Sequence, residues 1–553
     1  MGLFVDRKGV ERKKLYSLSK PLIRLSRAGD FVYRRDLVRG GVLFLGSPGS
    51  GKTSDMKVWQ AICWSDQHAA LILSCKPETV EEALAVAEQV GRLDDVMIVR
   101  PGGYVLKFLA DAIKHHGNTK GVVEQVVERL MEAEEIATRK YGGMATDDFF
   151  IPAKKGLIRE CTFVDMMAHD GEVSLLRILL YIQTLPTSLA ALEDPNRCEI
   201  LKALELAEQK CPESRRGELA LARDYFTKEI PNLSDKTRSS IQITATVGLG
   251  PLLRFPLVDL FDGTGEEIDP AECIRQRKIV IVDVPVKVYG ETIAKVAGVI
   301  YKKVWADTLH RRWQTWDGDP DDMPLCGIWV DESQTMVTLS DLSYVDTCRS
   351  TRGYLAYATQ NLPGFINELG GNEKARHITD TLLANLTIHV AHNNKCPQTN
   401  KYMSDVIGKE IVRRRAWGHN AGDDGRGGIN HAYNEGWTEV WEYQSPSDVF
   451  QKLQCGGMAS DPPLTVEGII YVAGRTFKHN GKRYLKMRFR QDGFRPNVAV
   501  FAEKIPEARN WSPHVPCTEL GKAIFRRSDD QHALFTRWCE FWINPQSAAK
   551  GGA

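Results

Sequence analysis

The sequence lacks the features of a secreted, zinc-binding or membrane-spanning protein. Its 12 cysteines are scattered singly and form no Cys-x-x-Cys pair, so zinc sites and disulfide scaffolds are not expected. The N-terminus has no apolar signal-peptide core. No run approaches the roughly 18 apolar residues that span a bilayer. The best candidate, residues 173–182, is too short and contains Arg177. These absences predict a cytoplasmic protein.

Net charge is almost absent as well. The formal charge is +1, which excludes a globally basic nucleic-acid coat but leaves local patches open. Only the first forty residues are strongly biased, with 11 Lys and Arg against 4 Asp and Glu. Such an arm suits an anionic membrane or nucleic acid, and a plain solvated segment is an equal alternative. The length of 553 residues predicts several domains, or one large core with an insertion.

A phosphate-binding loop is the clearest positive signal. It follows the apolar run 42–45 and precedes a helix-like stretch, 54–64, which is the strand–loop–helix context that the motif requires. Glycines let backbone N–H groups turn toward phosphate oxygens, while the lysine reaches the β- and γ-phosphates and the threonine holds Mg²⁺. The sequence therefore predicts ATP or GTP binding. The loop residues are Gly46, Ser47, Pro48, Gly49, Ser50, Gly51, Lys52 and Thr53.

Apolar runs alternating with helical patterns predict a doubly wound, mostly parallel sheet. Helical periodicity without strand signals predicts an all-helical insertion over residues 104–240. Residues 418–436, rich in Gly, Asn and Asp, read as a mobile loop, and Asn480-Gly481 predicts a hairpin between 475–479 and 482–487. The strand-like runs are 69–74, 96–99, 278–284, 327–330, 354–358 and 386–391.

Two of these strands end in an acid that could complete a Mg²⁺ site. One ends at Asp283, and the other ends at Asp331 followed by Glu332. Hydrolysis also needs a group that orients or deprotonates water. Only the second strand supplies one, so we favour Asp331 for the metal and Glu332 for the water. The competing interpretation is that both acids merely begin a surface helix.

Two further polar residues flank the strand 354–358. Gln360 follows it and could contact the γ-phosphate, although glutamine at a strand end is common. Arg349 precedes it and could neutralise transition-state charge in a neighbouring subunit, an effect worth about 10³–10⁵ in rate. A solvated or phosphate-positioning arginine fits the residues equally well.

The order of these motifs resembles the type IV coupling proteins of the TraG/TraD type, within the FtsK/HerA group of ring-forming DNA motors. The resemblance covers most of residues 40–500. It rests on the phosphate loop, the helical insertion, Ile328-Trp-Val-Asp-Glu332, Arg349-Ser-Thr-Arg-Gly, Ala358-Thr-Gln-Asn, and Leu383-Ala-Asn-Leu-Thr before Gly408-Lys409.

The resemblance implies a hexameric RecA-like P-loop ATPase of the α/β class that uses ATP and Mg²⁺. It implies that Glu332, Lys52, Arg349 and Gln360 are catalytic, with Arg349 supplied in trans and Gln360 sensing the γ-phosphate. Together with the charge count and the helical periodicity, the expected organisation is a basic segment at 1–40, a nucleotide-binding domain at 41–103 and 241–500 interrupted by the all-α domain at 104–240, and a helical tail at 501–553. The family's N-terminal transmembrane helices have no counterpart in the sequence, so a separate membrane subunit at the inner-membrane face is one expectation.

Two stretches are candidates for contact with DNA. The first combines Lys409, Arg413, Arg414, Arg415 and Trp417. In the second, basic and aromatic residues alternate with mostly apolar ones, which places the two sets on opposite faces of a strand. A solvated edge strand explains this second pattern equally well. Its polar set is Lys482, Tyr484, Lys486, Arg488 and Arg490.

The leading hypothesis is an ATP-driven DNA-translocating ring that delivers DNA, or DNA bound to a relaxase, to a secretion channel. One alternative is a nucleotide-gated adaptor that recruits effector proteins through the helical insertion. Another is a HerA-like motor subunit of a defence system, which would need a partner to cut DNA. These hypotheses differ in the cargo, and the sequence does not specify the cargo.

Overall fold

A nine-stranded sheet organises the computed structural model, which describes residues 16–116, 121–138, 150–186, 188, 198–423, 429–491 and 493. The strand order is β13-β12-β9-β3-β8-β7-β4-β6-β5, and all neighbours from β9 to β5 are parallel. The strands are β3 (Gly41–Leu45), β4 (Ala69–Leu73), β5 (Val96–Val99), β6 (Ile279–Val282), β7 (Cys326–Asp331), β8 (Gly353–Thr359), β9 (Ile388–His392), β12 (Thr465–Val472) and β13 (Tyr484–Arg490). The predicted α/β class is confirmed.

Both faces of the sheet are covered, which explains why its central strands read as continuous apolar runs. On one face, Phe44 and Trp329 pack in a core with α2 (Lys52–Ser65) and α3 (Thr79–Gln89). On the other, Leu43 and Ile328 pack in a second core with α15 (Glu291–Thr315) and α16 (Ser340–Thr351). The remaining helices after β6 are α14 (Val286–Tyr289), α17 (Leu362–Glu368), α18 (Glu373–Asn385), α19 (Pro397–Ile407) and α20 (Ser447–Gln451).

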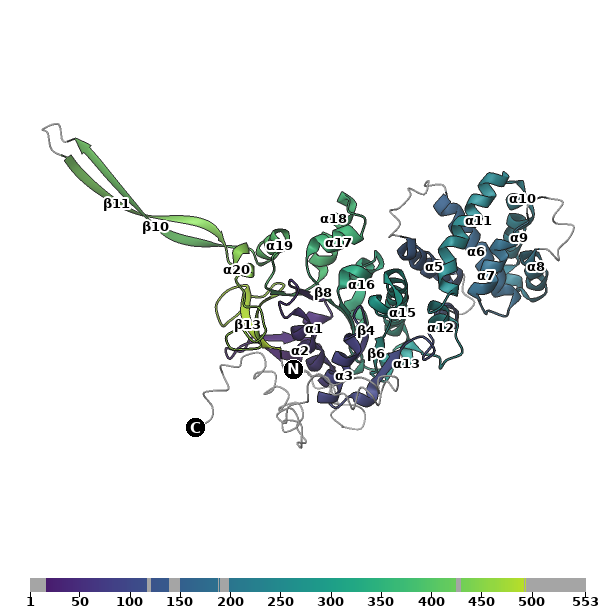
Figure 1. The fold of residues 1–553 in the computed structure, drawn as a ribbon, viewed down its shortest axis with the longest axis horizontal. Coiled ribbons are helices and arrows are strands. Elements are labelled where there is room, and N and C mark those ends of the chain that lie inside the picture. The colour runs from purple at the N-terminus through teal and green to yellow at the C-terminus, as the bar shows by residue number, and fades with distance from the viewer. Residues whose placement is uncertain are drawn as a thin grey trace.

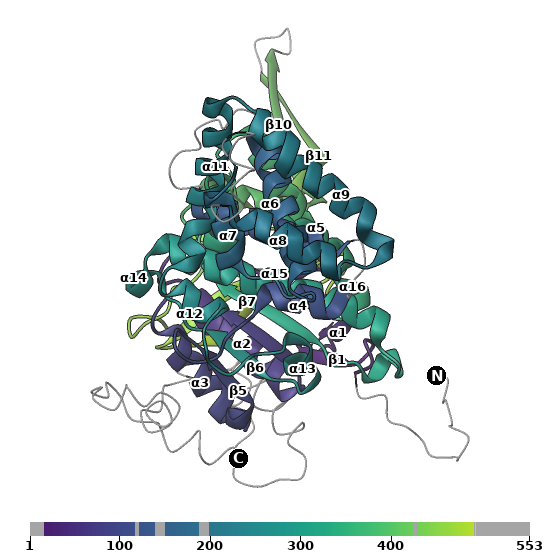
Figure 2. The same ribbon diagram turned by 90° about the vertical axis from the view of Figure 1, so that its right-hand side faces the viewer.

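The described chain between β5 and β6 forms helices and no strand. Figure 2 shows α6, α7, α8, α9 and α11 above the layer that holds β6 and β7, whereas α13 lies beside β6. Buried Arg129 joins it to the sheet's own helices, because its guanidinium lies 3.1 Å from Asp111 and 3.2 Å from Asp307 of α15. The helices are α4 (Phe108–His116), α5 (Val122–Thr138), α6 (Phe150–Ala168), α7 (Leu175–Gln183), α8 (Glu199–Lys210), α9 (Arg216–Asp224), α10 (Ile230–Asn232), α11 (Asp235–Leu249), α12 (Leu257–Phe261) and α13 (Pro270–Arg275).

The N-terminal residues from 16 onward belong to the fold, so the prediction of a basic surface arm is wrong for them. They form β1 (Pro21–Arg24), β2 (Phe31–Tyr33) and α1 (Arg34–Leu37). Arg34 is buried, and its guanidinium makes two bonds of 2.6 Å to Asp66, just beyond α2. His68 bonds to the same carboxylate at 3.1 Å. Residues 1–15 and the predicted tail at 501–553 lie outside the described part.

A long two-stranded arm replaces most of the predicted loop at 418–436, so that prediction is wrong for the described residues. Strands β10 (Lys409–Asp423) and β11 (Ile429–Tyr443) pair only with each other and project from the body (Figure 1). Both faces of each strand carry polar residues, so the sequence shows no alternation of apolar and polar residues that would predict a strand. Register pairs Ile411 with Trp441 and Arg413 with Glu439 on one face.

The predicted hairpin is correct in its second strand only. Strand β13 begins at Tyr484 and pairs antiparallel with β12, whereas residues 475–477 are irregular and 478–480 form a turn. Leu485, Met487 and Phe489 are buried, so the alternation of the two faces is as predicted. No helix in the described part of the chain is long and apolar enough to cross a membrane.

Replacing Asp66 by Asn should destabilise the protein strongly, because Arg34 would stay buried without its counter-charge. Removing one partner of a buried ion pair typically costs about 3–5 kcal/mol. The midpoint of urea unfolding, followed by circular dichroism, measures the loss. Asp448→Asn is the matched control, since it breaks an exposed pair with Lys452 and should leave the midpoint unchanged. Equal midpoints for the two variants would refute this account of the N-terminal elements.

Candidate functional site

The phosphate loop has the backbone that its glycines predict. It leaves β3 at Leu45 and enters α2 at Lys52, with Gly49 at φ 77° and Gly51 at φ 92°. A Cβ on Gly51 would lie 2.4 Å from Cγ1 of Val466, so this position excludes any side chain both by backbone angle and by space. The loop therefore holds α2 with its N-terminus open toward the same edge where β3 ends.

Sheet register brings the acid pair to this loop. Strand β8 lies between β3 and β7, pairing Leu45 with Thr359 and Ala358 with Asp331. Asp331 accepts a hydrogen bond from the Thr53 hydroxyl at 3.3 Å. The Lys52 ammonium lies 3.5 Å from Asp331 and 3.6 Å from Glu332. Residues almost 280 positions apart thus form one cluster.

Glu332 is held in an unusual backbone conformation, with φ 57° in the left-handed region that non-glycine residues seldom adopt. Its carboxylate accepts hydrogen bonds from Gln334 at 2.9 Å and from Gln360 at 3.1 Å. Burial raises the pKa of Glu332, but the Lys52 ammonium, the Gln334 amide and the Lys76 ammonium outweigh it and hold the pKa at about 2. Glu332 is therefore a carboxylate at neutral pH.

Lys76, which the sequence reasoning missed, contacts both acids more closely than Lys52 does. Its ammonium lies 2.8 Å from Asp331 and 3.1 Å from Glu332, and the two carboxylates raise the pKa of Lys76 against the effect of burial. Lys76 follows β4, the other neighbour of β7, by three residues. Its position just beyond the predicted strand 69–74 is the sequence signal that could have identified Lys76.

Amide side chains complete the cluster, and they too were missed. Thr359 donates to the Gln334 side-chain oxygen at 2.8 Å, which orients the Gln334 amide toward Glu332. Asn394 donates to the Gln360 carbonyl at 2.9 Å. The backbone carbonyl of neighbouring Asn393 accepts a bond from the Ser47 N–H at 2.9 Å. These contacts tie the carboxyl ends of β8 and β9 to the phosphate loop.

Asp283, the alternative acid, lies elsewhere along the same edge. It follows β6, which is separated from β3 by β8, β7 and β4. Its carboxylate is 2.5 Å from the Arg100 guanidinium, and burial raises the pKa of Asp283 despite that arginine. The geometry therefore favours Asp331 and Glu332 as the partners of the phosphate loop.

The residues present fit a magnesium nucleotide. A hydroxyl and a carboxylate, Thr53 and Asp331, face each other, and oxygen ligands of this kind suit Mg²⁺. Lys52 and the open N-terminus of α2 suit phosphate. In addition, the Ser50 hydroxyl is buried in the loop without a hydrogen-bond partner among the described residues. A polar group of that kind normally requires a partner.

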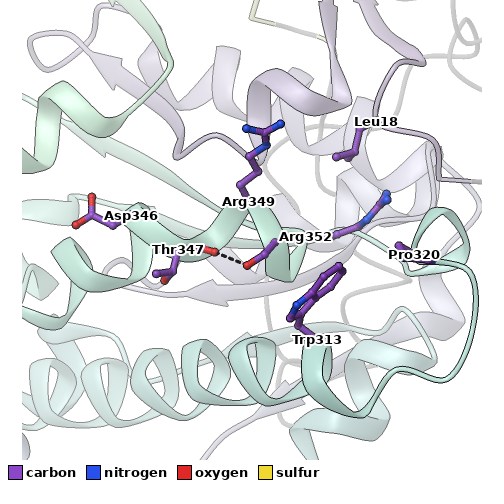
Figure 3. A pocket seen from close by; sticks show the side chains of 8 residues that line it. Leu18, Trp313, Pro320, Asp346, Thr347, Arg349 and Arg352 are labelled. Carbon is purple, nitrogen blue, oxygen red and sulfur yellow. Dashed lines mark hydrogen bonds between the residues drawn. The ribbon is translucent and has the colours of Figure 1, made fainter.

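Arg349 lies at the opposite edge of the sheet from this cluster. It precedes β8, whereas Gln360 follows it, and seven residues of strand span roughly 23 Å. Its side chain is exposed, and no carboxylate in the described part of the chain pairs with it. Figure 3 shows Arg349 with Trp313 and Arg352 around a hollow of about 440 Å³. Arg352, by contrast, is fixed to Asp321 at 2.8 Å.

Most basic groups of the two candidate DNA surfaces lie beside acids, and Lys409 instead lies over the ring of Tyr443. On the arm, Arg413 lies 2.9 Å from Glu439, and the two strands carry four basic against five acidic residues. On β13, Lys486 and Arg488 share Glu467, at 2.8 and 3.3 Å. On the arm, this balance leaves little net charge for phosphate groups, whereas on β13 two basic residues share one acid and a net positive charge remains. The arm instead exposes large side chains, namely Ile411, Trp417, Trp437 and Trp441.

The comparisons with known proteins fit this geometry. Residues 326–440 match the family described as "TraM recognition site of TraD and TraG". That segment contains Asp331, Glu332, Arg349, Gln360 and most of the arm. No curated protein sequence matches the chain. The resemblance to TraG/TraD-type coupling proteins, predicted from motif order, is confirmed over this segment.

Solved structures of the plasmid coupling protein TrwB share the fold. The complex with the ATP analogue ADPNP has a TM-score of 0.52 and 14% identity, covering 86% of this chain and 91% of that one. The complex with ADP and Mg²⁺ has a TM-score of 0.51 and 15% identity, covering 86% and 90%. The unbound conjugative coupling protein TrwBdeltaN70 has a TM-score of 0.52 and 13% identity, covering 86% and 90%. The RecA-like P-loop fold is thus confirmed.

Replacing Glu332 by Gln should lower stability at neutral pH in the absence of nucleotide and Mg²⁺. Because the folded-state pKa of about 2 lies below the ordinary 4.5, the ionised carboxylate stabilises the fold above about pH 4.5. That contribution is lost as the pH falls toward 2. The difference in melting temperature between wild type and Glu332→Gln should therefore shrink over this range. Glu82→Gln, which removes a half-buried carboxylate paired with Lys57 outside the site, is the control. A constant difference would contradict the assignment.

Proposed function

We propose that this chain, with its TraG/TraD-type segment and TrwB-like fold, is a Mg²⁺-dependent ATPase that drives DNA through a ring of its own copies. The observation that carries the proposal is the convergence of Lys52, Thr53, Asp331, Glu332 and Gln360 at one edge of the sheet. A phosphate loop alone would bind a nucleotide. A carboxylate held ionised beside it can also act on water.

Each residue has a role that follows from its contacts. Lys52 binds the β- and γ-phosphates, while Thr53 and Asp331, through water, hold Mg²⁺, which neutralises phosphate charge when bound. Glu332 orients the attacking water and accepts its proton. Gln360 donates a hydrogen bond to Glu332 in this structure, so it can exchange that bond for one to the γ-phosphate. ATP and Mg²⁺ are supported by the bound groups named for TrwB.

The position of Arg349 supports an active unit in which several copies of the chain form a ring. Because it lies about 23 Å of strand away from Gln360, it cannot serve the nucleotide of its own subunit. Exposed and without a carboxylate partner in the described residues, it is free to enter a neighbour's site. A head-to-tail contact of this kind closes into a ring when its rotation permits. We propose a hexamer, as the resemblance to coupling proteins implies.

DNA is the proposed cargo, because TrwB is described as a conjugative coupling protein. A protein-recruiting adaptor is the second candidate, since the family model over residues 326–440 is described as a recognition site for TraM. Under either reading, a relaxase or effector protein and a separate membrane subunit at the cytoplasmic face are the proposed partners.

The ATPase rate at low salt, with and without DNA, separates these functions. A motor should hydrolyse ATP several-fold faster when single- or double-stranded DNA is added, and the effect should fade with salt. Lys52→Ala and Glu332→Gln should each lower the rate at least about 100-fold while leaving the circular dichroism unchanged. Hydrolysis unaffected by DNA, with a secreted protein co-purifying, would favour the adaptor. Full activity of Glu332→Gln would remove Glu332 from the mechanism.

Mixing two inactive variants tests whether Arg349 acts across the interface. Arg349→Ala subunits keep an intact phosphate loop, and Lys52→Ala subunits keep an intact Arg349. Random mixed rings should regain about a quarter of the wild-type sites, each formed between one subunit of either kind. Arg352→Ala mixed with Lys52→Ala is the control, because Arg352 is bound within its own subunit. No recovery in rings shown to be mixed would count against a role in trans.

A further inference from the structure

Lys76 contacts Asp331, the acid that would hold Mg²⁺ through water. Its ammonium contacts Oδ2 of Asp331 at 2.8 Å, and the Thr53 hydroxyl donates to this same oxygen at 3.3 Å. Thr53 and Asp331 are the two groups that fit Mg²⁺. An ammonium on this oxygen takes the place of the water through which Asp331 would hold Mg²⁺, and the two cations would repel each other at such a short distance.

The burial of the groups shows which cation can leave. The side chain of Lys76 is 40% exposed, whereas that of Lys52 is 6% exposed. Lys76 can therefore swing into water, where an ammonium is well solvated, at low cost. Asp331 and Glu332 are mostly buried and would be costly without a counter-charge.

The backbone around Lys76 stays anchored while its side chain can move. The Ser74 hydroxyl donates to the Lys76 carbonyl at 2.7 Å. The Cys75 thiol lies 3.4 Å from the Thr335 hydroxyl, in the turn that follows Glu332. Departure of Lys76 thus requires rotation of one flexible side chain and no rearrangement of the loop.

We propose that Lys76 is an internal counter-ion that neutralises Asp331 and Glu332 in nucleotide-free subunits and withdraws when Mg²⁺ and ATP enter. This inference rests on the proposed ATPase function. It adds that Lys76 regulates the entry of Mg²⁺ into the site. A subunit without nucleotide would resist Mg²⁺, because the metal must displace Lys76. The arriving phosphates draw Lys52 to themselves, which leaves Mg²⁺ as the replacement for Lys76 at the acids.

Binding of Mg²⁺ alone, without nucleotide, tests this inference. Lys76→Met keeps the aliphatic stem and removes the charge, so the Mg²⁺ concentration that half-maximally raises the melting temperature should fall about tenfold. Lys76→Arg keeps the charge and should behave like wild type. Lys57→Met is the matched control, because it removes a lysine of α2 that pairs with Glu82 away from the acids. An unchanged Mg²⁺ requirement in folded Lys76→Met would overturn the proposal.

Binding of ADP in the presence of EDTA distinguishes the counter-ion role of Lys76 from a role as a phosphate ligand. If Lys76 were instead a phosphate ligand, Lys76→Met would bind ADP more weakly without Mg²⁺, and this result would also overturn the proposal. The counter-ion role predicts unchanged ADP affinity in EDTA and tighter binding when Mg²⁺ is limiting. A wild-type protein that binds no nucleotide at all would defeat the ATPase proposal itself, which is a different outcome.

Discussion

The parallel register of β3, β8 and β7 is the constraint on which the site depends. Parallel neighbours end at the same edge, so whatever follows each strand is placed side by side. The phosphate loop follows β3, Gln360 follows β8, and Asp331 and Glu332 end β7. The same register places Arg349, which precedes β8, at the far edge. The strand register thus assembles the cluster that we propose to be hydrolytic, and it separates this cluster from Arg349, which we propose acts in a neighbouring subunit.

The same strand register brings acidic and basic side chains of the cluster close enough for their charges to balance. Two mostly buried carboxylates stand beside two lysines, and each lysine reaches both acids. The lysines differ in exposure, and this difference supports the proposal that Lys52 binds phosphate and that Lys76 is the lysine that leaves. The left-handed backbone of Glu332 and the amides of Gln334 and Gln360 fix the second acid in place.

The sequence predicted those features of the site that depend on local pattern. The phosphate loop, the acid pair and Gln360 each follow an apolar strand, so their meeting at one edge could be anticipated. Lys76 could not, because its contacts depend on β4 lying beside β7, which no local pattern specifies. The arm was misread because both of its faces carry polar residues. The basic N-terminal stretch was misread because a charge count does not reveal that Arg34 is buried against Asp66.

The central claim is that the site is completed between subunits, and a structure of the assembled protein tests it most directly. Electron microscopy of the full chain with a non-hydrolysable ATP analogue, Mg²⁺ and DNA would locate Arg349 relative to each nucleotide. The account predicts a closed ring in which Arg349 of one subunit contacts the γ-phosphate bound by Lys52 of the next. A nucleotide-loaded particle in which Arg349 faces solvent, or touches no neighbouring nucleotide, would contradict it.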